Sequence, residues 1–262
     1  GRAADLKYPP YISSLIVVED PAACGLSNDE VYELLRPYGG VAFVGDDVLV
    51  REGPLPDAGQ WTHQYADAAR SAVSRDDRVR LPLGLLWYGT VSNNNVLPRH
   101  AAGPRPQVAG GRLAILGVEC IGARDVYTGR ELWVRSFPGV GHPFTNLELE
   151  EKWRAGEDVY MSNIPGAAYI GSPYVTLPDS IYLRYRGRIH RLDAATGETL
   201  AEFPLYPEGT PPPNDWGPVS VWENLLITCT DPHEFDDRKL GWSESWNATS
   251  SSRLVVMDRF TG

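Results

Sequence analysis

Three short turns of one kind constrain this sequence more than any other feature. The first lies in Ala123–Trp133 (ARDVYTGRELW), and similar units return in Leu192–Leu200 and Met257–Gly262. In each, an Asp stands three residues before a Thr-Gly pair; Asp and Thr side chains bond turn amides, and glycine accepts a positive φ. The Thr-Gly pairs begin at positions 128, 196 and 261, which are 68 and 65 residues apart. A strand–turn–strand unit that returns in this way predicts a propeller or another repeat array.

The first unit resembles the tryptophan-docking motif of the pyrroloquinoline-quinone-type β-propellers. The pattern Ala-x-Asp-x-x-Thr-Gly-x-x-x-Trp is matched at Ala123, Asp125, Thr128, Gly129 and Trp133. The resemblance implies that the Trp133 ring lies flat between adjacent blades and that the small Ala123 leaves room for it.

The second and third units match the motif less completely. The second keeps Asp193, Thr196 and Gly197, but Ala201 stands roughly where the tryptophan is expected, with Phe203 nearby. The third unit ends before its tryptophan position. We therefore expect a mainly β chain that forms a partial, quinoprotein-like propeller of four-stranded blades, preceded by a short α/β segment.

Turn and strand patterns place two complete blades and parts of two more in residues 53–262. Gly110-Gly111 and Arg186-Gly187 mark hairpin turns between apolar strands. Propellers close with about four to eight blades, so this number leaves the ring incomplete. Because the chain starts without Met and ends within a repeat unit, we expect it to be part of a longer protein. Its first partners are then the missing blades of that parent chain.

Residues 1–52 do not follow the blade pattern. The apolar run Ser14–Val18 predicts a buried parallel strand, and Val41–Val44 predicts a second strand. Between them Ser27 and Glu30 form a capping-box pattern, which begins a short helix.

This strand–helix–strand unit resembles the end of a class I S-adenosylmethionine-dependent methyltransferase domain. The resemblance rests on Leu34–Gly40 (LLRPYGG) followed by a strand, and it covers about the last third of such a domain. The glycine-rich loop and acidic residue that would hold the cofactor lie upstream in that family and are absent here. The sequence therefore excludes a complete methyltransferase site, and a generic α/β unit is an equal alternative.

The composition excludes several classes of function. A formal net charge of −10 and a pI near 5.0 argue against nucleic-acid binding. The three cysteines, Cys24, Cys120 and Cys229, are far apart and predict neither a metal site nor a disulfide framework. No apolar run is long enough to span a membrane.

Two long polar segments contain the candidate ligand-binding residues. His63, Arg99, His100 and Arg105 lie before the first complete blade, in loops that could face a central channel. His142 and Asn146 lie in the long segment after that blade. The alternative for each is that its side chain satisfies backbone carbonyls in a long connection. No catalytic residue and no metal ligand set is predicted.

The family resemblance leaves two functions open. Its dehydrogenases bind pyrroloquinoline quinone with a Ca²⁺ held by Glu, Asn and Asp, and many use a vicinal Cys pair. Neither that pair nor the calcium motif occurs in these 262 residues, so these cofactors are expected only if a complete propeller supplies them. Other members are non-catalytic, such as an outer-membrane-assembly lipoprotein scaffold. We favour a binding or scaffolding module with a protein or small-molecule ligand over part of a quinoprotein dehydrogenase. The resemblance also suggests a periplasmic or extracytoplasmic location.

Overall fold

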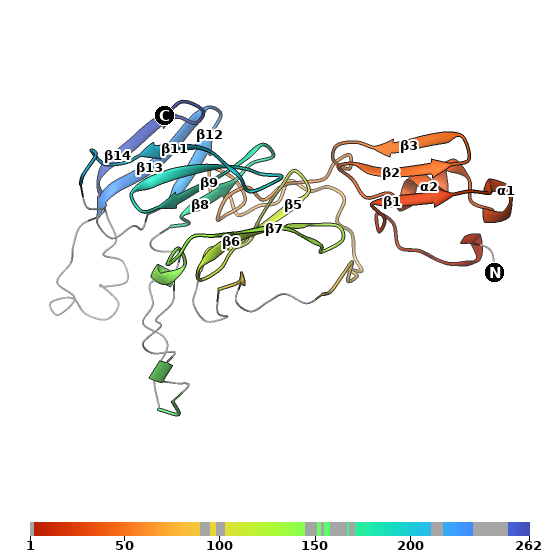
Figure 1. The fold of residues 1–262 in the computed structure, drawn as a ribbon, viewed down its shortest axis with the longest axis horizontal. Coiled ribbons are helices and arrows are strands. Elements are labelled where there is room, and N and C mark those ends of the chain that lie inside the picture. The colour runs from red at the N-terminus through yellow and green to blue at the C-terminus, as the bar shows by residue number, and fades with distance from the viewer. Residues whose placement is uncertain are drawn as a thin grey trace.

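The protein is mainly β, with four sheets and few helices among its described residues (Figure 1). The computed structural model describes residues 3–89, 95–97, 103–144, 151–152, 155–157, 167, 171–210, 217–232 and 251–262. None of the helices in these ranges is both long and apolar enough to cross a membrane.

The N-terminal unit, residues 3–52, is a three-stranded sheet with a helix on one face. Its elements are β1 (Leu15–Val18), α1 (Pro21–Cys24), α2 (Asn28–Leu34), β2 (Gly40–Val44) and β3 (Asp47–Arg51), after a 3-10 turn at Ala3–Asp5. β1 pairs with β2 in parallel, and β3 adds to β2 as an antiparallel hairpin. The capping box that begins α2 is formed by Ser27 and Glu30, as expected. The third strand was not predicted from the sequence.

Three antiparallel sheets follow, and we call them blades 1, 2 and 3. Blade 1 is β4 (Gln107–Ala109), β5 (Arg112–Leu116), β6 (Cys120–Asp125) and β7 (Glu131–Ser136), and blade 2 is β8 (Tyr174–Thr176), β9 (Ser180–Tyr185), β10 (Arg188–Asp193) and β11 (Thr199–Pro204). Blade 3 has the described strands β12 (Val219–Trp222), β13 (Leu225–Pro232) and β14 (Ser251–Asp258). In each blade the strands pair in chain order. This architecture agrees with a partial, propeller-like fold.

Strand β9 explains how the blades stack on one another. Its side chains alternate between two hydrophobic cores, because successive residues of a strand point to opposite faces. Ile181 and Leu183 pack with blade 1, whereas Tyr182 packs with blade 3. All three are fully buried. Blade 2 is therefore covered on both faces, which is why Ile181, Tyr182 and Leu183 can be consecutive large, buried side chains.

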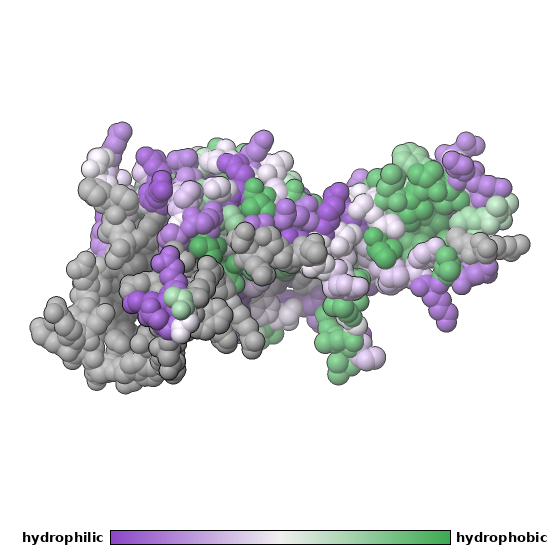
Figure 2. All heavy atoms as spheres, turned by 60° about the horizontal axis from the view of Figure 1, so that its bottom comes forward, coloured by the Kyte–Doolittle hydropathy of each residue, from purple (hydrophilic) through white to green (hydrophobic). Residues whose placement is uncertain are grey.

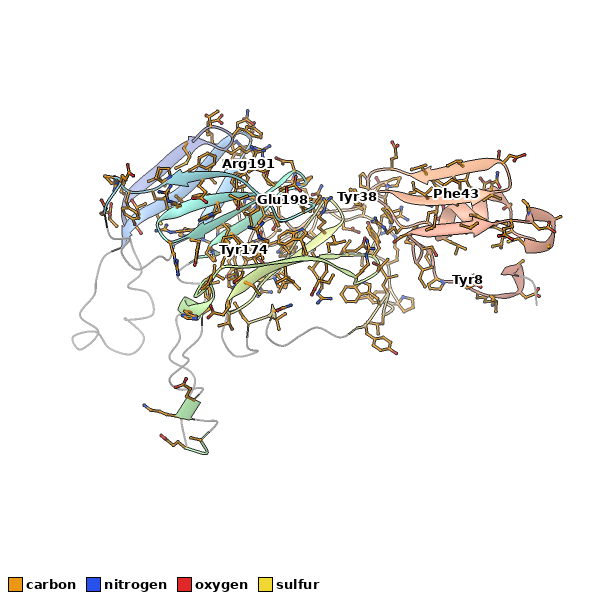
Figure 3. The ribbon with its side chains drawn as sticks, viewed as in Figure 1. Tyr8, Tyr38, Phe43, Tyr174, Arg191 and Glu198 are labelled. Atoms are coloured by element: carbon orange, nitrogen blue, oxygen red, sulfur yellow. The ribbon has the colours of Figure 1, made fainter. Side chains whose placement is uncertain are left out.

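The N-terminal unit contacts blade 1 through aromatic and charged side chains. A Cβ added at Gly111, in the β4–β5 turn, would lie 2.4 Å from the Tyr38 ring, so this ring packs directly against the turn (Figure 3). Tyr11 meets Tyr127 edge to face, with ring centroids 6.3 Å apart. Arg36 forms an ion pair with Asp125 of β6.

Candidate functional site where the blades meet

A short segment before blade 1 joins the first strands of all three blades. Trp61 exchanges two backbone hydrogen bonds with Val108 of β4, and the Thr62 carbonyl accepts the Thr176 amide of β8 at 3.0 Å. The next residue, His63, accepts the Val221 amide of β12 on its Nε2 atom at 3.2 Å. We call Trp61–Gln64 the hub segment. Strand β8 contacts both β4 and β12, so the hub segment lies where the three blades converge.

His63 is held in its neutral form at the hub. The side chain is buried, and this burial lowers its pKa to about 4. Because Nε2 accepts a hydrogen bond, the proton of the neutral ring lies on Nδ1. Nδ1 then donates to the Thr62 hydroxyl at 2.7 Å, and that hydroxyl donates to the Ala66 carbonyl. The ring thus has a fixed tautomer and a structural partner on each nitrogen.

Arg105 lies beside the hub segment through its backbone. Its amide donates to the Gln64 side-chain oxygen at 2.9 Å, and its carbonyl accepts the Tyr174 hydroxyl at 2.9 Å. Tyr174 is fully buried, which raises its pKa. The side chain of Arg105 is exposed. The structure therefore brings His63 and Arg105 to one region, with the Arg105 guanidinium free to face solvent.

Two buried oxygens near the hub have unused hydrogen-bonding capacity. Gln107 uses its side-chain amide nitrogen to donate to Ser172 and to the Tyr174 carbonyl. Its Oε1 atom and the Thr176 hydroxyl have no hydrogen-bond partner among the described atoms, although both side chains are completely buried. Buried polar atoms of this kind usually bind an ordered water or a ligand group. Sequence reasoning did not select either residue, since an isolated Gln or Thr in a short strand gives no signal.

The remaining candidates lie elsewhere or outside the described residues. His142, in the 3-10 turn His142–Phe144, is in close contact with Glu119 through Nε2. The hydrogen bond from His142 is the main cause that lowers the pKa of Glu119, whose other carboxylate oxygen accepts the Gly139 amide at 2.7 Å. This pair ties the segment after β7 to the β5–β6 turn. The other three candidates, Arg99, His100 and Asn146, are outside the described residues.

The three Thr-Gly turns share one geometry. Each turn begins with an aspartate: Asp125, Asp193 or Asp258. One oxygen of its carboxylate accepts hydrogen bonds from the backbone amides of the second and third residues after it, at 2.8–3.0 Å. The glycine amide of the turn donates to the backbone carbonyl of the same aspartate at 2.8–2.9 Å. Burial opposes ionisation of Asp193, but the amide and hydroxyl bonds of its turn outweigh it and lower the pKa. The hydrogen bonds of the third turn lower the pKa of Asp258 in the same way, so these two turns favour an ionised aspartate.

An aromatic ring lies against the glycine of every turn. If each glycine had a Cβ, that atom would lie only 2.3–2.8 Å from the nearest ring carbon. The three ring–glycine pairs are Trp87 with Gly129, Trp133 with Gly197 and Phe203 with Gly262. The two tryptophans also donate Nε1–H to a backbone carbonyl of the turn, Trp133 to Ala194 at 3.2 Å and Trp87 to Val126 at 2.8 Å. Sequence reasoning missed Trp87 because it stands 42 residues before its turn, outside any repeat unit.

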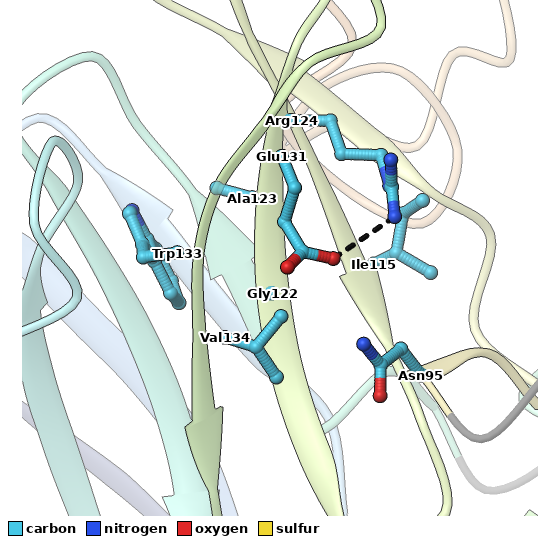
Figure 4. Close-up of a pocket in the computed structure, with 8 residues that line it drawn as sticks. All are labelled: Asn95, Ile115, Gly122, Ala123, Arg124, Glu131, Trp133 and Val134. Atoms are coloured by element: carbon cyan, nitrogen blue, oxygen red, sulfur yellow. Dashed lines mark hydrogen bonds and ion pairs between the residues drawn. The ribbon is translucent and has the colours of Figure 1, made fainter. Parts of the chain in front are cut away.

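The face of blade 1 has a shallow hollow (Figure 4), lined by Asn95, Ile115, Gly122, Ala123, Arg124, Glu131, Trp133 and Val134. Arg124 and Glu131 form an ion pair of 3.0 Å on its wall. The hollow has room for about one water molecule. Within the described ranges, no three His, Cys, Asp or Glu side chains are grouped so that they could hold a metal ion.

Comparison with known proteins gives structural neighbours only. No family model and no curated protein sequence matches the chain. BamB from Moraxella catarrhalis matches 59% of this chain and 33% of its own, with 14% identity and a TM-score of 0.31. The quinohemoprotein alcohol dehydrogenase from Comamonas testosteroni matches 64% of this chain and 22% of its own (18% identity, TM-score 0.41). A europium-containing methanol dehydrogenase matches 78% of this chain and 31% of its own, with 16% identity and a TM-score of 0.42. The chain thus spans a third or less of these structures.

Proposed function

We propose that this chain is part of a pyrroloquinoline-quinone-type β-propeller that acts as a non-catalytic binding or scaffolding module. The hub segment is the observation that carries the proposal. Three consecutive residues use their polar atoms to join three blades, and the candidate histidine among them, His63, has both ring nitrogens occupied. A pKa of about 4 also makes it a weak general base at neutral pH.

The inter-blade role of the docking residues is part of the same proposal. Ala123 lies directly opposite Trp133 on the β6–β7 ladder, and both are buried in the core between blades 1 and 2. We assign Asp125, Thr128 and Gly129 to one docking turn. The second turn consists of Asp193, Thr196 and Gly197. The repeated contact of an aromatic ring with the glycine of the next turn supports this assignment.

The same contact suggests a further blade before blade 1. Trp133, in the outer strand β7 of blade 1, packs against Gly197 of the next turn, and Trp87 packs against Gly129 in the same way. Leu81–Gly89 then corresponds to the outer strand of another blade. Its residues Leu81, Leu83, Leu85 and Tyr88 are 69–89% exposed, as expected of a strand whose partners in the same blade belong to a missing part of a parent chain. We also propose that residues 1–52 are the end of a methyltransferase-type domain joined to this propeller.

The alternative is part of a quinoprotein dehydrogenase for alcohols or sugars. The unpartnered oxygens of Gln107 and Thr176 favour it, because they could receive a polar ligand at the hub. In a complete ring, pyrroloquinoline quinone and Ca²⁺ would then be the cofactors.

A titration separates the two functions. The purified protein is titrated with pyrroloquinoline quinone and Ca²⁺, and its thermal unfolding and dye-linked alcohol oxidation are followed. The binding-module proposal predicts neither a saturable rise in Tm nor turnover. Turnover together with a rise in Tm that the variant Gln107→Leu abolishes would overturn it. Exposed Leu254 provides the matched control, Leu254→Gln, which must behave as the unchanged protein does.

A further inference from the structure

One face of the N-terminal sheet is apolar at every position and exposed at nearly all of them. The side chains alternate along each strand: Ile16, Val18, Ala42, Val44 and Leu49 pack against α2. The other set forms what we call the open face, Leu15, Val17, Val41, Phe43, Val48 and Val50; all but the partly buried Val41 are 42–61% exposed. Figure 2 shows this apolar surface over the N-terminal unit at the right of the view, and Figure 3 labels Phe43.

The open face is ordered as two rows across the sheet. The strand register places Val17, Phe43 and Val48 side by side, and the same register aligns Leu15, Val41 and Val50. A sheet face in contact with water normally has polar residues at these positions. A contiguous apolar patch on a soluble protein marks an interaction site.

The strand pairing indicates what kind of structure covers the open face. β1 and β2 are parallel, and parallel strands occur in layered folds in which helices cover both faces of the sheet. Here α2 covers one face only. A helix is therefore the element that completes the layer. The strands are four or five residues long, roughly 13–17 Å, a length that about three helical turns span.

Negative charge at one end of the sheet indicates that this helix has basic side chains. Glu19, Asp20, Asp46 and Asp47 follow the ends of β1 and β2 or begin β3, and all four are exposed. Residues 1–52 hold nine acidic and four basic side chains. Two of the basic side chains, Arg36 and Arg51, form ion pairs with Asp125 and Glu33. A second copy of this chain would bring a net negative charge of its own to this end, whereas a basic partner would be attracted.

We propose that the open face binds an amphipathic α-helix of a partner, with an apolar side on the two rows and basic side chains beside the acidic end. This recognition places a helix on an apolar surface and uses residues spaced three and four apart as anchors. Phe43 lies at the centre of the first row and is the main contact.

The test measures binding of a fluorescent 14-residue helical peptide of leucine and lysine, with the leucines on one side, by anisotropy. The comparison peptide has glutamate in place of lysine. Phe43→Asp removes the central apolar contact, and Leu254→Asp changes an equally apolar, 70% exposed residue of β14 as the matched control. Circular dichroism verifies that both variants fold.

We expect Phe43→Asp to weaken binding of the lysine peptide about tenfold or more, and Leu254→Asp to leave it unchanged. The glutamate peptide is expected to bind at least about tenfold more weakly than the lysine peptide. Equal losses in the two variants, or equal binding of the two peptides, would overturn the proposal. A dimer detected by light scattering and abolished by Phe43→Asp would overturn it in favour of a second copy.

Discussion

The Arg36 guanidinium lies 2.8 Å from the Asp125 carboxylate and joins the N-terminal unit to the first Thr-Gly turn. Asp125 uses one oxygen to accept the turn amides and the other to bind Arg36. Its side chain is only 3% exposed. The same carboxylate therefore shapes a turn of blade 1 and fixes that turn to a different sheet.

Replacing Arg36 should destabilise the protein measurably. Arg36→Met leaves the buried Asp125 carboxylate without its cation, and we expect the free energy of unfolding to fall by about 1–3 kcal/mol. Urea denaturation measures this loss. The control is Arg188→Met, because Arg188 is about half exposed and 3.9 Å from Glu202, a pair that contributes about 0–1 kcal/mol. Equal losses would show that the Arg36–Asp125 pair has no special weight.

Substitution of two glycines should separate backbone strain from ring contact. Gly197 and Gly209 both have a positive φ, 73° and 82°, but a Cβ at Gly197 would lie 2.6 Å from the Trp133 ring, whereas nothing lies within 4 Å at Gly209. Gly209→Ala should cost only the strain of about 1–2 kcal/mol. Gly197→Ala should cost clearly more in the same urea experiment. A loss no larger than that of Gly209→Ala would contradict the contact between the ring and the turn.

The tryptophans should differ in their contributions to stability. Trp133 is 9% exposed between blades 1 and 2, so Trp133→Ala should reduce the free energy of unfolding by about 3–5 kcal/mol. Trp133→Phe keeps a ring but loses the bond to the Ala194 carbonyl, at a cost of about 1 kcal/mol. Trp222 is 58% exposed, and Trp222→Ala should change stability by about 0.5 kcal/mol or less. Similar values for Trp133→Ala and Trp222→Ala would refute this difference.

Stability should depend on pH through His63. Its pKa is about 4 in the folded protein and about 6.5 in the unfolded chain. The unfolded chain therefore binds the proton first, so this stabilisation is complete above pH 6.5 and is lost as the pH falls toward 4. The loss amounts to about 2–3 kcal/mol. Urea denaturation at pH 7.5 and 4.5 should show this loss of stability in the unchanged protein but not in His63→Gln. The variant keeps every carboxylate of the unchanged protein, including nearby Asp67, so carboxylate titration contributes equally to both. A loss of the same size in both proteins would contradict this role of His63.

Local sequence patterns predicted the parts of the fold that local chemistry determines. The capping box of Ser27 and Glu30, the Gly110-Gly111 hairpin and the Asp-to-amide turns depend on neighbouring residues, and the structure has all of them. Strand β3 was missed because Asp47–Arg51 begins with a charge and precedes a proline- and glycine-rich segment.

Contacts between distant residues could not be predicted from the sequence. The bond from the Val221 amide to His63 joins residues 158 positions apart. His63 was selected as a candidate ligand by its residue type and by its position in a loop before the first complete blade, and neither distinguishes a ligand-binding histidine from one that accepts a backbone amide. The contact of Trp87 with Gly129 likewise depends on how the chain returns to blade 1.

Hydrogen exchange at three amides tests most directly the claim that the hub segment joins the blades. The amides of Val108, Thr176 and Val221 donate to Trp61, Thr62 and His63 in turn. The account predicts that nuclear magnetic resonance will find all three protected as strongly as the interior amides of β9, and that His63→Ala will release the Val221 amide first. Exchange of the three amides at the rate of an unstructured chain, while β9 stays protected, would contradict it.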